Sequence, residues 1–160
     1  MSIDDLHAAL ELIKSNPEVC FFAGARDPRV VELAEKTLCL QYPPSYREFL
    51  LRLGAGNVGA EEIYGVIDDD FVDSGVPDGV WMTLRGRREW GLPDRLAVIY
   101  FDGATSYFAL DTADRHSEEE CPIVVWSLGL SKPDDGLEVV AQDFGSFLLE
   151  IARRAIPDLT

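Results

Sequence analysis

The stretch from residue 96 to residue 110 restricts the fold more than any other part of the chain. Leu96 to Phe101 is a continuous run of apolar, β-branched and aromatic residues, which is typical of a central strand. Asp102-Gly103 is a turn signal, and Tyr107 to Leu110 provides the returning strand of a hairpin. Shorter apolar runs predict further strands at residues 63–67, 123–126 and 137–140.

Helical patterns lie on both sides of these strands. Predicted helices begin at Ser2, Asp27-Pro28, Pro43-Pro44 and Asp143, where a capping side chain or a proline precedes an apolar stripe. Residues 80–90 fit either a helix or a loop. We therefore predict an α+β fold with an antiparallel or mixed sheet of about five to six strands, flanked by N-terminal helices and one C-terminal helix. The length of 160 residues suits a single domain over residues 1–160.

Negative charge is the strongest compositional signal. The chain has 14 Lys and Arg residues against 29 Asp and Glu residues, which gives a net charge of −15. Residues 53–84 contain seven acids and no base, and residues 102–143 contain ten acids and two bases. Such a surface repels nucleic acid and anionic membranes and attracts a basic protein. The plainer alternative is that the charge only keeps the protein soluble.

The location and redox state are predicted from what the sequence does not contain. No run approaches the ~18 apolar residues of a membrane span. The segment that begins Met1-Ser2-Ile3 lacks the basic and apolar regions of a secretory signal, so we expect a cytoplasmic protein. Cys20, Cys39 and Cys121 are far apart and odd in number, so we expect three reduced thiols and neither a disulfide nor a zinc site.

Three motifs resemble ligand sites. Residues 54–59, Gly-Ala-Gly-Asn-Val-Gly, match the dinucleotide fingerprint, but a helix precedes them and a strand follows, so we predict a turn. Asp68-Asp69-Asp70 lacks the spacing of a calcium loop. The segment from His116 to Cys121 offers too few soft ligands for zinc. We therefore expect solvated acidic loops, with no metal and no cofactor.

Catalytic patterns are equally sparse. His7 and His116 are the only histidines, and no nucleophile elbow or phosphate-binding Gly-Lys-Ser/Thr sequence occurs. A hydrolytic pair of carboxylates stays open as an alternative, because 29 acidic residues permit many pairs whose separation the sequence does not give. We predict a protein that is not an enzyme.

Several short motifs occur in a fixed order over roughly residues 32–152. The first is Leu-Gln-Tyr-Pro-Pro-Ser-Tyr-Arg-Glu-Phe-Leu at residues 40–50, followed by Leu53-Gly54-Ala55-Gly56. The later ones are Ile63-Tyr64-Gly65, Leu92-Pro93, Asp102-Gly103, residues 121–126 and residues 141–148. Together they resemble the SUKH superfamily, most closely its Smi/Knr-like branch. Gly54-Ala55-Gly56 departs from the usual Asn-Gly-Gly, and residues 1–31 look like a helical N-terminal extension.

The resemblance implies an α+β binding domain without enzymatic activity. Bacterial members are typically immunity proteins that bind and silence a cognate toxin, often a nuclease, and others are regulatory scaffolds. The resemblance carries no catalytic residues over to this chain. Our leading hypothesis is an immunity protein that binds a cognate toxin or another basic protein. A regulatory scaffold without a toxin, and a small-molecule-binding or hydrolytic protein, are the alternatives.

The partner-binding residues are expected among the acidic loops. The candidates are Asp68, Asp69, Asp70, Asp73 and Asp78 as steering charges, together with Glu118, Glu119 and Glu120. Trp81 is the predicted buried anchor, and Trp90 is a further interface candidate, because tryptophans are enriched at binding hot spots.

Overall fold

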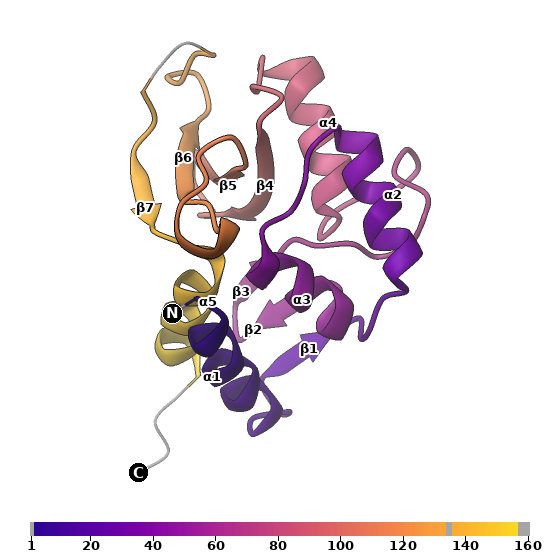
Figure 1. The fold of residues 1–160 in the computed structure, drawn as a ribbon, viewed down its shortest axis with the longest axis vertical. Coiled ribbons are helices and arrows are strands. Elements are labelled where there is room, and N and C mark those ends of the chain that lie inside the picture. The colour runs from indigo at the N-terminus through magenta and orange to yellow at the C-terminus, as the bar shows by residue number, and fades with distance from the viewer. Residues whose placement is uncertain (1, 134–135, 157–160) are drawn as a thin grey trace.

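Five α-helices and seven strands form the part of the chain that the computed structural model describes, residues 2–133 and 136–156 (Figure 1). The helices are α1 (Ser2–Lys14), α2 (Pro28–Leu38), α3 (Pro44–Leu53), α4 (Gly79–Glu89) and α5 (Phe144–Ala155). The strands are β1 (Cys20–Phe22), β2 (Gly56–Val58), β3 (Glu61–Ile63), β4 (Leu96–Phe101), β5 (Ser106–Asp111), β6 (Ile123–Ser127) and β7 (Val139–Ala141). A short 3-10 turn, η1 (Ser117–Glu119), lies between β5 and β6. The predicted α+β class is confirmed.

The strands form two antiparallel sheets, of order β1-β2-β3 and β4-β5-β6-β7. The predicted hairpin is the β4–β5 pair, in which Ala97 lies opposite Leu110. The expected count of about five to six strands in one sheet differs from the seven observed. The difference arises because residues 20–22 pair with residues 56–58 and begin a sheet of their own.

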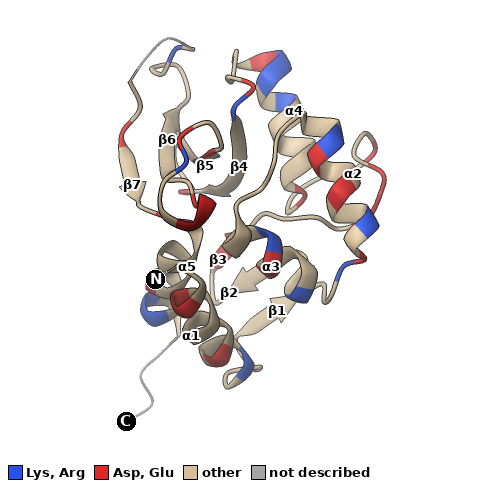
Figure 2. Ribbon diagram, viewed as in Figure 1, with Lys and Arg blue, Asp and Glu red and all other residues tan. Residues whose placement is uncertain are grey.

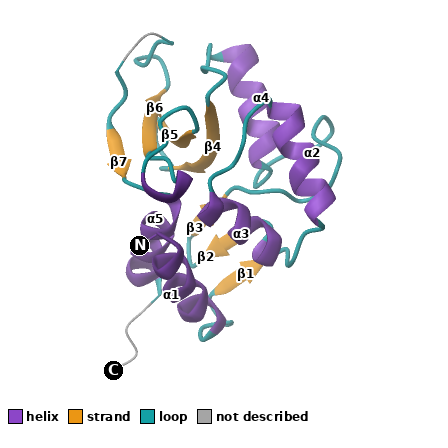
Figure 3. Ribbon diagram, viewed as in Figure 1, coloured by secondary structure: helices purple, strands orange, loops and turns teal. Residues whose placement is uncertain are grey.

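Of the ambiguous residues 80–90, those up to Glu89 belong to the helix α4, and Trp90 follows its end. The arginines of this segment explain why its sequence fitted either a helix or a loop. Arg85 forms an ion pair with Glu89 one turn later, and Arg87 donates a hydrogen bond to the Leu38 carbonyl of α2. These side chains lie along α4 and do not interrupt it. Figure 3 shows α4 beside α2, and it shows α1 beside α5 at the other end of the molecule.

β4 is an outer strand of the order β4-β5-β6-β7 and not the central strand that its continuous apolar run indicated. The run is nevertheless buried on both faces of the sheet. Ala97 and Ile99 belong to the main core, whereas Leu96 and Val98 belong to a second cluster against α4. The main core centres on aromatic side chains of α3 and α5: the Tyr46 and Phe144 ring centroids are 4.9 Å apart. Edge-to-face pairs of this kind add to the free energy of area burial.

The first and last helices close the main core together. Leu6 and Leu10 of α1 share a cluster with Leu148 of α5. At the N-terminal ends of the two helices, the Gly145 N–H donates to the Ser2 hydroxyl at 3.2 Å. A Cβ added at Gly145 would lie 1.9 Å from the Ser2 carbonyl oxygen, so glycine is what allows this contact. Residues 2–31, predicted as an extension, therefore contribute to the same core.

Candidate functional site

The acidic loop, residues 68–73, joins β3 to α4 on the surface. Asp68, Asp69, Asp70 and Asp73 are all exposed, as the sequence predicted. Asp70 accepts hydrogen bonds from the N–H groups of Asp73 and Val72, at 3.0 Å each, and these donors hold the pKa of its carboxyl below the ordinary value. The loop is therefore held in a local turn that presents ionised carboxylates to solvent.

Two valines interrupt the acidic surface. Val72 is 81% exposed, and Val76, in the segment that leads into α4, is 51% exposed. A single exposed valine is common on protein surfaces and would need no explanation. Two exposed valines beside charged side chains form apolar surface that a binding partner can bury. Neither valine was predicted from the sequence, although an apolar residue inside an acidic run is a signal that could have indicated both.

The cations that the structure describes form no ion pairs with the acidic loop. Among residues 2–133 and 136–156, no ion pair includes a carboxylate of the acidic loop. Arg47 pairs with Glu35 and Arg95 with Asp111, both away from the loop. Arg26 donates to the Ile67 carbonyl, directly before the loop, and forms no ion pair with its acids. The exposed carboxylates of the loop are thus available for long-range steering of a basic protein.

Asp78 is not a steering charge, and this corrects the sequence-based expectation. Its side chain is 0% exposed and is the N-cap of α4, where it accepts hydrogen bonds from Val80 N–H at 2.9 Å and Trp81 N–H at 3.1 Å. Burial raises the pKa of the Asp78 carboxyl, and the two backbone donors oppose that rise. The cap fixes where the helix that carries Trp81 begins.

We expect Asp78→Ala to lower the free energy of unfolding by about 1–2 kcal/mol, because two N–H groups at the start of α4 lose their acceptor. Asp78→Asn keeps an acceptor and should lose less. Asp27→Ala is the matched control, since Asp27 caps α2 through Arg29 N–H but is exposed. Urea unfolding measures all three, and equal losses for the two alanine variants would contradict a special role for the buried cap.

Trp81 is half-buried and lies in an aromatic patch that we define as Trp81, Arg85, Trp90 and Tyr107. The Arg85 guanidinium lies 5.5 Å from the Trp81 ring centroid, a cation–π arrangement. The Trp90 and Tyr107 rings stack with centroids 4.6 Å apart. These are the residue types enriched at binding hot spots. Trp81 lies in the first turn of α4. That Trp81 anchors a partner stays a prediction.

The second group of predicted acidic residues, Glu118 to Glu120, contains two exposed side chains and one buried side chain. Glu118 and Glu119 in η1 are exposed, whereas Glu120 is only 3% exposed. Glu120 accepts hydrogen bonds from Ser45 N–H at 3.0 Å and from the Ser45 hydroxyl at 2.7 Å, at the start of α3. Glu120 therefore does not face a partner, contrary to our expectation, because it satisfies polar groups at a buried helix start.

The two exposed acidic segments do not merge into one surface. In Figure 2, the acidic loop lies beside α2, whereas the short red turn η1 lies on the other side of α3, near α5. The predicted set of acids thus separates into the acidic loop, the η1 pair Glu118 and Glu119, and the two interior carboxylates. Of these, the acidic loop combines charge with exposed apolar side chains, and it is the candidate functional site.

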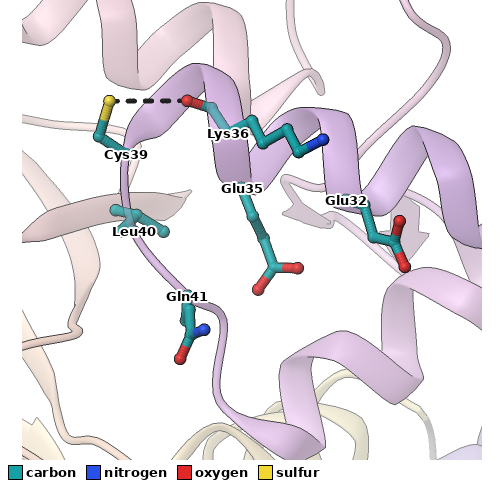
Figure 4. A pocket seen from close by; sticks show the side chains of 6 residues that line it. All are labelled: Glu32, Glu35, Lys36, Cys39, Leu40 and Gln41. Carbon is teal, nitrogen blue, oxygen red and sulfur yellow. Dashed lines mark hydrogen bonds between the residues drawn. The ribbon is translucent and has the colours of Figure 1, made fainter.

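A hollow of roughly 450 Å³ lies between α2 and the segment that follows it (Figure 4). The polar residues that line it include ones that hydrogen-bond within the protein. Glu35 points into this space, but one carboxylate oxygen accepts from Tyr42 N–H at 2.8 Å and the other from Arg47. The exposed Cys39 thiol donates a weak hydrogen bond to the Lys36 carbonyl, at 3.6 Å. These contacts hold the connection between α2 and α3 in place.

Within residues 2–133 and 136–156, no group of three or more His, Cys, Asp or Glu side chains is arranged to hold a metal ion. None of the helices in these ranges has the length and apolar character needed to cross a bilayer.

The fold and its motif positions agree with a known family. Residues 3–153 match the family model described as SMI1-KNR4 cell-wall, a SUKH family. The chain belongs to this SUKH family. The resemblance drawn from residues 32–152 is thus confirmed, and the match starts within α1. The superfamily includes immunity proteins. No curated protein matches the chain by sequence.

Proposed function

We propose that this SUKH protein is an immunity-type protein that binds a basic toxin domain through the acidic loop and does so without catalysis. The observation that carries the proposal is the set of exposed loop carboxylates that no Lys or Arg of residues 2–133 and 136–156 neutralises. The exposed Val72 and Val76 supply apolar contact beside the charges. The half-buried aromatic patch is a second surface whose residue types are enriched in interface anchors.

The electrostatics favour a cationic partner of the kind that binds nucleic acid. A nuclease groove concentrates Lys and Arg for phosphate contacts, and carboxylates compete for the same cations. A protein with a net charge of −15 accelerates the encounter with such a groove before any contact forms. A regulatory scaffold is the second candidate, and a cytoplasmic location suits both. The gene directly upstream distinguishes them, because an immunity gene follows the gene of its toxin.

Reversing charge in the acidic loop tests the proposal. We expect Asp69→Lys with Asp73→Lys to weaken binding to the toxin domain encoded upstream by about tenfold or more at ~0.15 M salt, mainly through a slower association rate. The loss should shrink as salt is added. Asp69 and Asp73 are chosen because their side chains, unlike that of Asp70, accept none of the hydrogen bonds that shape the loop.

Glu11→Lys with Glu18→Lys is the matched control, since both residues are exposed and lie outside the acidic loop. This double variant changes the net charge by the same amount and should bind almost as the unaltered protein does. Association rates from surface plasmon resonance compare the two directly. Equal rates for both double variants would mean that net charge alone acts. A toxin that stays fully active in the presence of the unaltered protein would refute the immunity role.

A further inference from the structure

Phe71 lies in the middle of the acidic loop and is nevertheless buried. Its side chain is 6% exposed and belongs to the main core, whereas its two neighbours, Asp70 and Val72, are exposed. A phenylalanine on a loop that only crosses the surface would lie in water, at a cost in free energy. The buried ring of Phe71 therefore ties the exposed carboxylates on both sides of it to the interior of the protein.

Backbone hydrogen bonds hold the two ends of the connection that contains the acidic loop together. The Gly65 N–H donates to the Pro77 carbonyl at 2.9 Å, and the Gly79 N–H donates to the Gly65 carbonyl at 2.8 Å. Arg26 donates to the Ile67 carbonyl, directly before the acidic loop. A surface loop whose ends are close and whose own side chain packs beneath it is an Ω-loop, a class that frequently carries function.

The outer part of the acidic loop is shaped by its own carboxylates. Asp68 accepts a hydrogen bond from the Asp70 N–H at 2.9 Å, and Asp70 accepts from the Val72 and Asp73 N–H groups. Hydrogen bonds that are exposed to solvent protect a segment only weakly against local opening. Burial of a phenylalanine side chain contributes more than such a hydrogen bond does, so the ring of Phe71 is what opposes loosening of this turn.

We propose that Phe71 is a positioning residue, which holds the acidic loop in its binding conformation before a partner arrives. The loop carboxylates then meet the cations of a basic protein without a rearrangement of the loop. This inference rests on the proposed function of the loop and adds what fixes its conformation. A partner binds only those molecules whose loop has the competent conformation, so its apparent affinity falls with their fraction. Preorganisation of this kind lowers the entropic cost of binding.

Truncation of the ring should loosen the acidic loop without changing its charge. In Phe71→Ala, we expect the ¹⁵N order parameters of residues 68–73 to fall from about 0.85 to below about 0.6. The affinity for the toxin domain encoded upstream should fall about tenfold or more, which corresponds to a competent fraction of about one tenth or less. The dependence of affinity on salt should stay as in the unaltered protein, because the variant keeps every carboxylate. Asp69→Lys with Asp73→Lys should reduce that dependence.

Phe147→Ala is the matched control, because Phe147 of α5 is also 6% exposed and belongs to the same core, but lies outside the acidic loop. A loss of stability alone would affect both variants, whereas only Phe71→Ala should loosen the loop and weaken binding. Phe71→Leu keeps a large apolar side chain and should retain most of the affinity, and Phe71→Val should lie between the leucine and alanine variants. If the alanine variant does not fold, the difference between the leucine and valine variants decides the test.

Three results would overturn the inference about Phe71. Residues 68–73 could stay ordered when the ring is truncated, Phe147→Ala could weaken binding by as much, or a loosened loop could bind as tightly as the unaltered one. The proposed function fails in a different way. An unaltered protein that does not bind the toxin domain refutes that function, and with it the binding role of Phe71. If the unaltered protein binds and Phe71→Ala binds equally well, only the inference about Phe71 is refuted.

Discussion

Gly65→Ala is expected to lower the free energy of unfolding by about 3 kcal/mol or more, because the backbone there leaves no room for a methyl group. A Cβ at this position would lie 1.8 Å from the Gly54 carbonyl oxygen. The neighbours cannot retreat cheaply: that oxygen accepts from Val66 N–H, and the Gly65 N–H and C=O bind Pro77 and Gly79. A shift that relieves the clash therefore breaks hydrogen bonds that join α3 to α4.

Denaturant unfolding followed by tryptophan fluorescence measures this effect. Gly75→Ala is the matched control, because a Cβ at Gly75 would meet nothing within 4 Å. We expect that variant to change stability by less than about 0.5 kcal/mol. An unfolding midpoint for Gly65→Ala equal to that of Gly75→Ala would mean that the backbone contact between residues 54 and 65 is looser than the structure indicates.

Glu120→Ala is expected to lower the free energy of unfolding by about 3 kcal/mol, since it leaves the N–H and the hydroxyl of the fully buried Ser45 without their acceptor. Each buried polar group without a partner costs about 1–3 kcal/mol. Glu119→Ala is the control, because Glu119 is exposed and its side chain should contribute less than about 0.5 kcal/mol. Similar unfolding curves for the two variants would show that Glu120 does not hold the start of α3.

The pH dependence of stability tests the burial of the Glu120 carboxyl, because burial raises its pKa and the hydrogen bonds from Ser45 lower it. Burial raises the pKa of the Glu120 carboxyl above its ordinary value of 4.5. Folding then favours the protonated form, so this contribution is fully present below pH 4.5 and is lost as pH rises through the folded-state pKa. Glu120→Gln cannot ionise, so the stability of the unaltered protein should fall relative to this variant over the pH range above 4.5. A constant difference across that range would contradict a raised pKa.

Most of the secondary structure was predictable from local signals. Asp27 and Asp143 cap helices through their side chains, as the sequence indicated, and Asp102 accepts hydrogen bonds in the β4–β5 turn. The three-stranded sheet was not predictable in the same way. Its strands are three residues long and pair across 38 residues between Cys20 and Val58, so neither periodicity nor turn chemistry identifies them.

The candidate site was predictable only in part, because exposure depends on tertiary contacts. Asp73 and Asp78 have similar sequence surroundings, yet Asp73 is exposed and Asp78 is buried at the start of α4. Glu119 and Glu120 differ in the same way, and the partner of Glu120 is 75 residues away along the chain. Local sequence shows which residues carry charge. Only the fold shows which of them find backbone donors inside the protein.

The contact between α1 and α5 has a consequence for how the protein is made. The two helices close one core, yet Ser2 and Gly145 are 143 residues apart in the chain. During synthesis at about 5–20 residues per second, the apolar stripe of α1 therefore waits on the order of ten seconds for its partner. Until α5 leaves the ribosome, nascent chains expose that stripe to chaperones and to one another. A protein that lacks α5 should keep the apolar stripe of α1 exposed and should therefore aggregate.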